Sequence, residues 1–220
     1  MERLDIGYDL LVQESEILRL EFWKMAFELL KNSGALKFED SGKNKGCWVM
    51  ALGAHQGTPS SRKRDDGSSK VDDDVKIVVR SNGTVTYVGK DIAYHLWKFG
   101  LLECDFNYER AYQYKSGHEV WKTSPVISKN TPSFGTAKKV YTVIDRRQSY
   151  LQGIVASGLD AIGYSNQSKN LHHIAYEIVG LSHRCTKEMG IKLDQDQKKR
   201  SYVEVSGRKG LGVKADDLID

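Results

Sequence analysis

The sequence predicts an α/β protein that contains part of a doubly wound parallel sheet. Residues 139–145, KVYTVID, form a compact β-branched run suited to a buried strand, and residues 146–163 have the length and apolar spacing of a helix. A second strand is expected in HHIAYEIVG, residues 172–180. A strand, a helix and a strand in this order imply a parallel pair with a right-handed crossover, and ligands of such sheets lie at the carboxyl ends of the strands.

The clearest helix is expected at residues 14–34, ESEILRLEFWKMAFELLKNSG. Its apolar residues recur at helical spacing, and lysine and glycine follow at its end as stop signals. Two short strands, at residues 35–40 and 46–52, stand on either side of the turn-like SGKNKG and could pair as a hairpin.

Residues 53–74 combine glycine, serine and both signs of charge with almost no apolar side chain. Such a segment cannot offset its ordering entropy by burial, so an exposed loop is expected. Its basic run around Arg62 could contact RNA phosphates, although composition favours a solvated surface.

A second hairpin is expected at residues 76–89, where two β-rich runs flank Asn82 and Gly83. A short helix should follow, with Asp91 at its start and glycine just past its end. Residues 103–139 are rich in Tyr, Pro, Ser and Lys with few periodic features, which indicates an irregular excursion.

Composition restricts the function only broadly. The 220 residues carry 33 basic and 29 acidic side chains, a net charge of +4 that permits contact with a polyanion without demanding it. The three cysteines have no paired spacing, so neither a zinc site nor a disulfide framework is indicated, and no metal site is expected. No stretch is long and apolar enough to span a bilayer, and Met1 is followed by charged residues, so a soluble cytoplasmic protein is expected.

The last residues, VEVSGRKGLGVKADDLID, place glycines beside cations as a phosphate-binding loop would. Gly207 and Gly212 have the separation of a P-loop, but Val-Lys-Ala follows and the hydroxyl that binds magnesium is missing. What remains is a glycine-rich loop with Arg208 and Lys209 ahead of a helix near Ala215. This loop could bind a polyphosphate, or it could be a glycine-rich turn whose lysines are solvated.

Tyr87 and Asp91 are candidates for a ligand site, because a strand end and the first turn of the next helix could project into one crevice. The alternatives are a packed aromatic residue for Tyr87 and a helix cap for Asp91. Gln148, just past the strand KVYTVID, and Glu14, at the head of the long helix, have similar structural alternatives.

In chain order, several segments resemble one family, the arginyl-tRNA synthetases of bacteria, which are class I enzymes. The resemblance is carried by YDLLVQESEIL, GKNKGCWVM, SNGTVTYVGKDIAYHLWKF, VYTVIDRRQSYLQ, HHIAYEIV and VEVSGRKGLGVKADDLID. It covers nearly the whole chain from about Ile6 onward and looks like the middle of such an enzyme. Several separate motifs in the right order are more specific than any one of them.

The resemblance implies an arginine pocket. Glu14 matches an acidic residue that faces the substrate guanidinium, Tyr87 and Asp91 match the pair that completes the pocket, and Gln148 matches a glutamine near the substrate amino group. A planar guanidinium is held best by fork-like carboxylate bonds, which lysine cannot reproduce. We therefore expect the carboxylates of Glu14 and Asp91 to lie close together and to be sheltered from water.

The resemblance also implies an ATP site. His173, Ile178 and Val179 would line the adenine and ribose, and the loop SGRKG would stand at the second class I signature. Within that loop, Ser206 and Lys209 would be the catalytic residues nearest the ATP phosphates. The residues expected to bind ATP are His173, Ile178, Val179, Ser206, Gly207, Arg208 and Lys209, and magnesium is expected to assist.

Several departures from the family limit what this chain should do alone. No HIGH-type first signature occurs, the loop is not a standard KMSKS sequence, and residues 181–200 look longer than in most relatives. The resemblance implies an α+β insertion region at residues 1–83 and the second half of the Rossmann-like catalytic domain at residues 84–220. The isolated chain is expected to be inactive.

The function implied is that of an arginine–tRNA ligase fragment, whose full-length enzyme activates arginine with ATP and transfers it to tRNA(Arg). The first alternative is a non-catalytic module derived from a synthetase, which would sense arginine or bind RNA. The second is an unrelated nucleotide-binding protein, supported by the half-Rossmann pattern alone. The oligomeric state is left open by the sequence.

Overall fold

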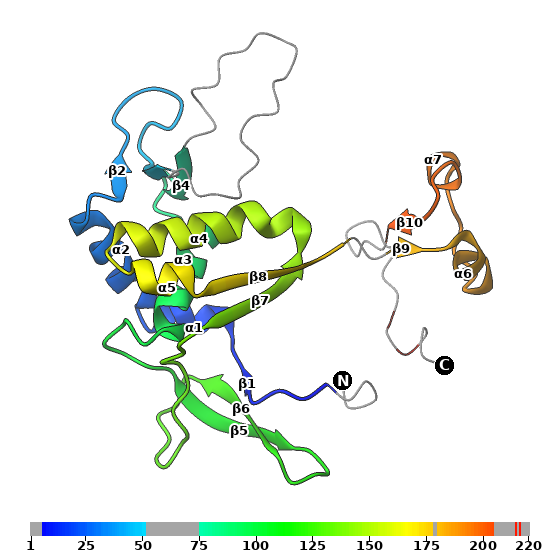
Figure 1. Ribbon diagram of the computed structural model, residues 1–220, viewed down its shortest axis with the longest axis horizontal. Helices are drawn as coiled ribbons and strands as arrows, with labels where there is room; N and C mark the ends of the chain where they lie inside the picture. Colours follow the sequence, from blue (N-terminus) through cyan, green and yellow to red (C-terminus); the bar gives the residue numbers. More distant parts are fainter. Residues whose placement is uncertain (1–5, 52–74, 178–179, 205–213, 215, 217–220) are drawn as a thin grey trace. The chain divides into compact units, whose positions relative to one another are not determined.

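The computed structural model describes residues 6–51, 75–177, 180–204, 214 and 216 of the chain. It is a mixed α/β structure with small sheets, and it divides into two compact units (Figure 1). Unit 1 comprises residues 1–142 and 148–174, and unit 2 comprises residues 143–147 and 175–220. The elements are β1 (Leu10–Leu11), α1 (Glu14–Arg19), α2 (Phe22–Asn32), β2 (Leu36–Phe38), β3 (Trp48–Ala51), β4 (Val75–Val79), α3 (Tyr87–Lys98), β5 (Asn107–Gln113), β6 (Glu119–Ser124), β7 (Val140–Asp145), η3 (Arg146–Gln148), α4 (Ser149–Ala161), α5 (Ser165–Lys169), β8 (Leu171–Tyr176), β9 (Gly180–Leu181), α6 (His183–Glu188), α7 (Gln195–Lys198) and β10 (Val203–Glu204).

The single helix predicted over residues 14–34 is wrong, because the chain breaks it into α1 and α2. Glu21 adopts a left-handed backbone conformation with φ of 58°, which is uncommon outside glycine. Phe22 is then fully buried, with its ring centroid 4.6 Å from that of Phe106. The break therefore coincides with the point where α2 turns its apolar face into the core.

The hairpin predicted over residues 35–52 is confirmed as β2 and β3, which pair antiparallel in the sheet β2-β3-β4. The turn at Asn82 and Gly83 is also confirmed, since Arg80 N donates to Thr84 O at 2.9 Å and Gly83 has φ of +82°. The prediction of a second strand after this turn is wrong, because only an isolated bridge joins Val79 to Val85 before the chain enters α3.

Helix α3 begins at Tyr87, four residues before the predicted start, because its apolar side chains recur at helical spacing. Val88, Ile92 and Leu96 are at most 1% exposed, and α3 packs against both α2 and α4. Helix α4 approaches closely at Gly158, where an added Cβ would lie 3.1 Å from Cδ1 of Ile92. Burial of one such side chain contributes about 1.5–3 kcal/mol to the free energy of folding. Packing in the core of unit 1 therefore favours a helix here over the strand that the local sequence predicts.

The segment from residue 103 to residue 139 is not irregular throughout, as the sequence had predicted, since it contains the antiparallel hairpin β5–β6. Tyr108 and Val120 are buried, whereas Tyr112, which pairs with Val120, is exposed. The hairpin is therefore partly solvated, as antiparallel strands often are, and its mixture of tyrosines and charged residues gave no clear strand pattern in the sequence. Strand β1 adds to the hairpin in parallel with β6.

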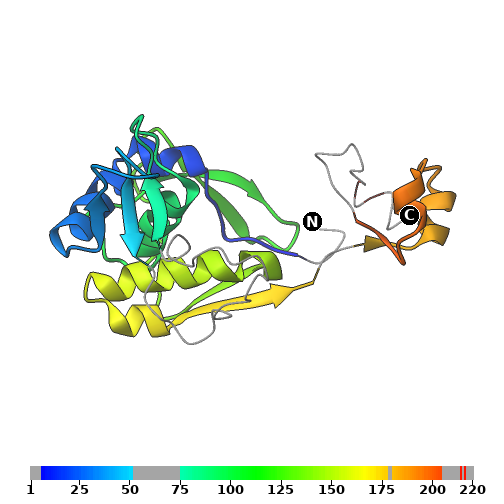
Figure 2. The same cartoon turned by 90° about the horizontal axis from the view of Figure 1, so that it is seen from above.

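The predicted order of strand, helix and strand is confirmed as β7, then η3 and α4, then β8. Strands β7 and β8 pair with each other, and Val140 N donates to Asn170 O at 2.9 Å, so the starts of the two strands lie side by side. Helix α4 lies alongside this pair in both views (Figures 1 and 2). Among the residues that the structure describes, no helix is long and apolar enough to cross a membrane.

Unit 2 is held by a short ladder and by ion pairs. Strands β9 and β10 pair antiparallel, and Arg147 bonds both Asp145, at 2.8 Å, and Glu204, at 2.9 Å. The pKa of Asp145 is lowered by its hydrogen bonds from Arg147. Helix α7 begins with a capping box formed by Asp194 and Gln197.

Candidate functional site

Asp91 carries a carboxylate that is costly to ionise where it stands. Burial is the main cause that raises the pKa of this carboxyl group, and the nearby charge of Glu14 raises it further. The positive charges of Lys98 and, less strongly, Lys90 lower this pKa. None of the described residues donates a hydrogen bond to the carboxylate. Because burial disfavours the charged form of Asp91, a cationic hydrogen-bond donor that pairs with the carboxylate would be stabilised at this position.

Glu14 is the second acidic group of the site. It is the first residue of α1 and lies close enough to Asp91 to raise the pKa of that residue. Its side chain is 66% exposed, and Oε1 is 2.7 Å from Nζ of Lys90, on α3. The two carboxylates are thus near each other, as expected. The expectation that both are sheltered from water is wrong for Glu14, whose exposed side chain pairs with an internal cation, and only Asp91 is partly buried.

Tyr87 lies one helical turn before Asp91, on the same face of α3. Its ring is 51% exposed, and Nζ of Lys76, on β4, is 5.8 Å from the ring centroid. The same ammonium is 5.7 Å from the ring of Tyr150, at the start of α4. This shared lysine connects the start of α3 with the start of α4, two residues after Gln148.

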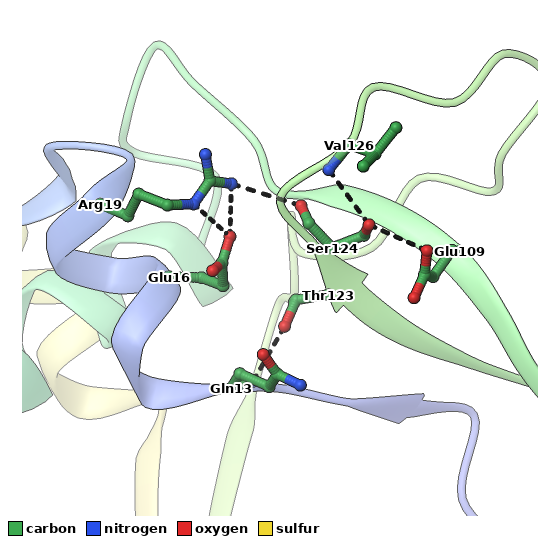
Figure 3. A network of polar contacts seen from close by, with 7 residues as sticks. All are labelled: Gln13, Glu16, Arg19, Glu109, Thr123, Ser124 and Val126. Carbon is green, nitrogen blue, oxygen red and sulfur yellow. Dashed lines mark hydrogen bonds and ion pairs between the residues drawn. The ribbon is translucent and has the colours of Figure 1, made fainter.

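Hydrogen bonds to the β5–β6 hairpin hold both ends of α1, the helix that carries Glu14 (Figure 3). The amide of Gln13, the N-cap of α1, donates to Oγ1 of Thr123 at 2.9 Å. At the other end of α1, Arg19 pairs with buried Glu16 and donates to the carbonyl of Ser124 at 3.3 Å. Both ends of α1 are therefore anchored on β6, which sets where Glu14 meets α3.

Figure 3 also shows how that anchor is held on the hairpin. The hydroxyl of Ser124 donates to Oε2 of Glu109 at 3.0 Å and accepts from the amide of Val126 at 3.1 Å. Lys122 pairs with the other oxygen of Glu109 at 2.8 Å. Strand β6, which positions α1, is thus joined to β5 by a side-chain hydrogen bond and an ion pair as well as by the backbone ladder.

The expected ATP site is described only in part. His173 lies on β8 and is half-buried. The other residues expected there lie outside the described residues; they are Ile178, Val179, Ser206, Gly207, Arg208 and Lys209. Within the described ranges, no group of three or more His, Cys, Asp or Glu side chains could hold a metal ion.

Sequence reasoning missed three residues next to the expected arginine site, namely Lys76, Lys90 and Tyr150. Lys90 stands three residues after Tyr87, a helical spacing that could have indicated it, whereas the contact of Lys76 with Tyr150 is long-range and left no signal. A separate open depression of about 500 Å³ lies in unit 2. It is lined by His183, Thr186, Lys187, Ile191, Lys192, Leu193 and Lys198.

No protein-family model matches the chain. Among curated proteins, the arginine–tRNA ligase of Thermococcus sibiricus is 32% identical over 220 residues, which cover 99% of this chain and 29% of the relative. The arginine–tRNA ligase of Pyrococcus abyssi is 34% identical over 224 residues, again 99% of this chain and 29% of the relative. The solved structure of Thermus thermophilus arginyl-tRNA synthetase matches with a TM-score of 0.65 at 31% identity, over 83% of this chain and 28% of that one.

The chain thus spans less than a third of the length of the relatives that it matches. The match nevertheless extends over almost all of its own sequence and is supported by a likeness of fold. Over nearly its whole length, the chain is homologous to part of the arginyl-tRNA synthetases.

Proposed function

We propose that Glu14, Tyr87 and Asp91 bind the guanidinium group of arginine, and that the chain forms part of an arginine–tRNA ligase. The observation that carries this proposal is the Asp91 carboxylate, which is partly buried, raised in pKa by that burial, and without a hydrogen-bond donor among the described residues. A guanidinium supplies planar, paired N–H donors together with a positive charge. It would therefore provide the missing hydrogen-bond donors and also stabilise the ionised carboxylate.

The remaining groups fit the rest of the ligand. The exposed ring of Tyr87 offers a face on which a guanidinium plane can stack. Gln148, the last residue of η3, has an amide that can accept from the α-amino group of arginine. Glu14 provides a second carboxylate from the opposite helix.

In the proposed reaction, a carboxylate oxygen of arginine attacks the α-phosphorus of ATP and the bond to pyrophosphate breaks. The arginyl group of the resulting adenylate then passes to the terminal ribose hydroxyl of tRNA(Arg), and AMP leaves. His173, Ile178 and Val179 would line the nucleotide, and Ser206 and Lys209 would stabilise the charge that moves onto pyrophosphate. Magnesium, which we expect with ATP, would neutralise phosphate charge, and we assign no residue to it.

This function is consistent with a finer description of the fold. The unit β7-α4-β8, whose strands start side by side, fits the second half of a Rossmann-like sheet of a class I synthetase. Residues 1–83 would then be an insertion and residues 84–220 would belong to the catalytic domain. A ligase of this kind would act in the cytoplasm.

Isothermal titration of the chain with arginine, lysine and citrulline tests the arginine site. Arginine should bind, whereas citrulline, which has nearly the same shape without the charge, should bind at least about tenfold more weakly, because a charge-assisted pair is worth about 1.5–3 kcal/mol. Asp91→Asn should lose most arginine binding, and Glu28→Gln, which removes an exposed carboxylate on α2, should not. Equal binding of arginine and citrulline would refute the assignment.

The ligase assignment requires a second measurement. Arginine-dependent exchange of pyrophosphate into ATP should be absent in the isolated chain and present in a protein extended to the length of the relatives. In that protein, Lys209→Ala should lower the exchange rate and leave arginine affinity unchanged. Arginine binding with no exchange in the extended protein would favour the non-catalytic arginine sensor instead.

A further inference from the structure

The Glu14 carboxylate already has a cation of the protein's own as its partner. Nζ of Lys90 lies 2.7 Å from Oε1 of Glu14, and the side chain of Lys90 is only 26% exposed while that of Glu14 is 66% exposed. Any cationic ligand that uses Glu14 must therefore displace or share this ammonium.

Lys90 is placed to persist in this position. It stands on α3 between Tyr87 and Asp91, and α3 is fixed by its fully buried face. Glu14 is fixed in turn by the amide of Gln13 on Thr123. Because both partners are attached to packed helices, the ammonium of Lys90 acts at a high effective concentration, of the order of millimolar even for flexible tethers.

Such a competitor imposes the same displacement cost on every cationic ligand, but ligands differ in what they gain at Glu14. The ammonium of a free lysine is the same chemical group as that of Lys90, so it gains nothing by exchanging with it. A guanidinium gains a paired, planar set of hydrogen bonds that a point charge cannot make. Displacing Lys90 therefore costs both ligands the same amount, but only the guanidinium recovers it at Glu14.

We propose that Lys90 is an internal competitor for Glu14, which lowers the affinity of the site for every cationic ligand and leaves a net gain at Glu14 only to a guanidinium. The inference rests on the proposed arginine site. Lys76 repeats the arrangement on the aromatic side, with its ammonium placed between the rings of Tyr87 and Tyr150. Glu14 and the ring of Tyr87 thus each have an internal lysine beside them, whereas Asp91 has no hydrogen-bond donor among the described residues.

Equilibrium dialysis with labelled arginine tests the proposal, with free lysine as competitor. In Lys90→Gln the inhibition constant of lysine should fall about two- to fivefold, because exposed ion pairs are worth only about 0.2–1 kcal/mol. The arginine dissociation constant should fall by at least the same factor, because arginine no longer has to displace Lys90 either. Lys90→Arg should weaken arginine binding, since the internal group then competes with the same chemistry.

Lys24→Gln is the matched control, because Lys24 forms an exposed pair with Glu21, 3.2 Å apart, on the same unit. It should leave both constants unchanged, and circular dichroism should confirm that all variants fold. If arginine binds but Lys90→Gln leaves the binding constants of both arginine and lysine unchanged, the role of Lys90 is refuted while the arginine site stands. If no variant and no wild-type protein binds arginine, the proposed function itself fails, and the role of Lys90 fails with it.

Discussion

The ammonium of Lys90 lies 2.7 Å from the carboxylate of Glu14, although 76 positions separate the two residues in the chain. This contact joins α1 to α3 and brings the two acidic groups of the candidate site into one electrostatic neighbourhood, since Glu14 and Lys90 both affect the pKa of Asp91. The site is therefore an assembly of two helices, each held by a different part of unit 1.

Asp91→Asn should abolish most arginine binding without lowering stability. Burial raises the pKa of Asp91, so the folded state retains a proton to higher pH than the unfolded state does, and ionising the group costs folding free energy as pH rises through that window. The amide removes this cost. Urea denaturation at pH 7 should give a midpoint equal to or above that of the wild type; a clear decrease would show that the carboxylate is stabilising.

His95 should make the protein sensitive to acid. It is 3% exposed, its Nε2 has no partner among the described residues, and burial lowers its pKa to about 4 from 6.5. The unfolded state then binds the proton first, so stability should fall as pH drops from about 6.5 to about 4, by up to about 3 kcal/mol. His95→Gln should be less stable at pH 7 but should lose less stability over that pH range.

Asp105 should be critical for the aromatic part of the core. Its Oδ1 accepts from Nε1 of Trp97 at 2.7 Å, from the hydroxyl of Tyr108 at 2.5 Å and from the amide of Phe106 at 2.8 Å. Asp105→Ala leaves these donors unpaired, at a cost of about 1–3 kcal/mol each. Denaturant midpoints should show a large loss for Ala and a smaller loss for Asn, whose side-chain oxygen can still accept. Equal losses would contradict this role.

Thr123 should act on the ligand site as a positioning residue, through Gln13. Thr123→Val keeps the shape but removes the oxygen that accepts from the amide of Gln13 at 2.9 Å. Arginine should bind about two- to tenfold more weakly, since one hydrogen bond contributes about 0.5–1.5 kcal/mol. Thr123→Ser, which retains the hydroxyl, should restore binding. A loss of stability in Thr123→Val without any change in arginine affinity would mean that the residue is only structural.

Much of the fold could be predicted from local pattern. The pairs of strands around SGKNKG, the turn at Gly83 and the order of β7, α4 and β8 all follow from turn chemistry and hydrophobic periodicity. The break at Glu21 could not be predicted, because a positive φ at glutamate has no sequence signature and is accepted only where burial of Phe22 compensates for it. The prediction of a second strand within residues 76–89 was wrong because Val88 and Ile92 pack into the core from a helix, and this packing overrides the local preference for a strand.

The sequence by itself determined which residues are candidates to hold a guanidinium, since the motifs around Glu14, Tyr87 and Asp91 resemble those of arginyl-tRNA synthetases. Only the tertiary structure decided that Asp91 is sheltered while Glu14 is exposed, and that Lys90 and Lys76 are already in contact with the groups a ligand would use. The physical reason is that burial and Coulomb interactions depend on distance in space. Residues from α1, β4 and α3 meet only after the core has closed.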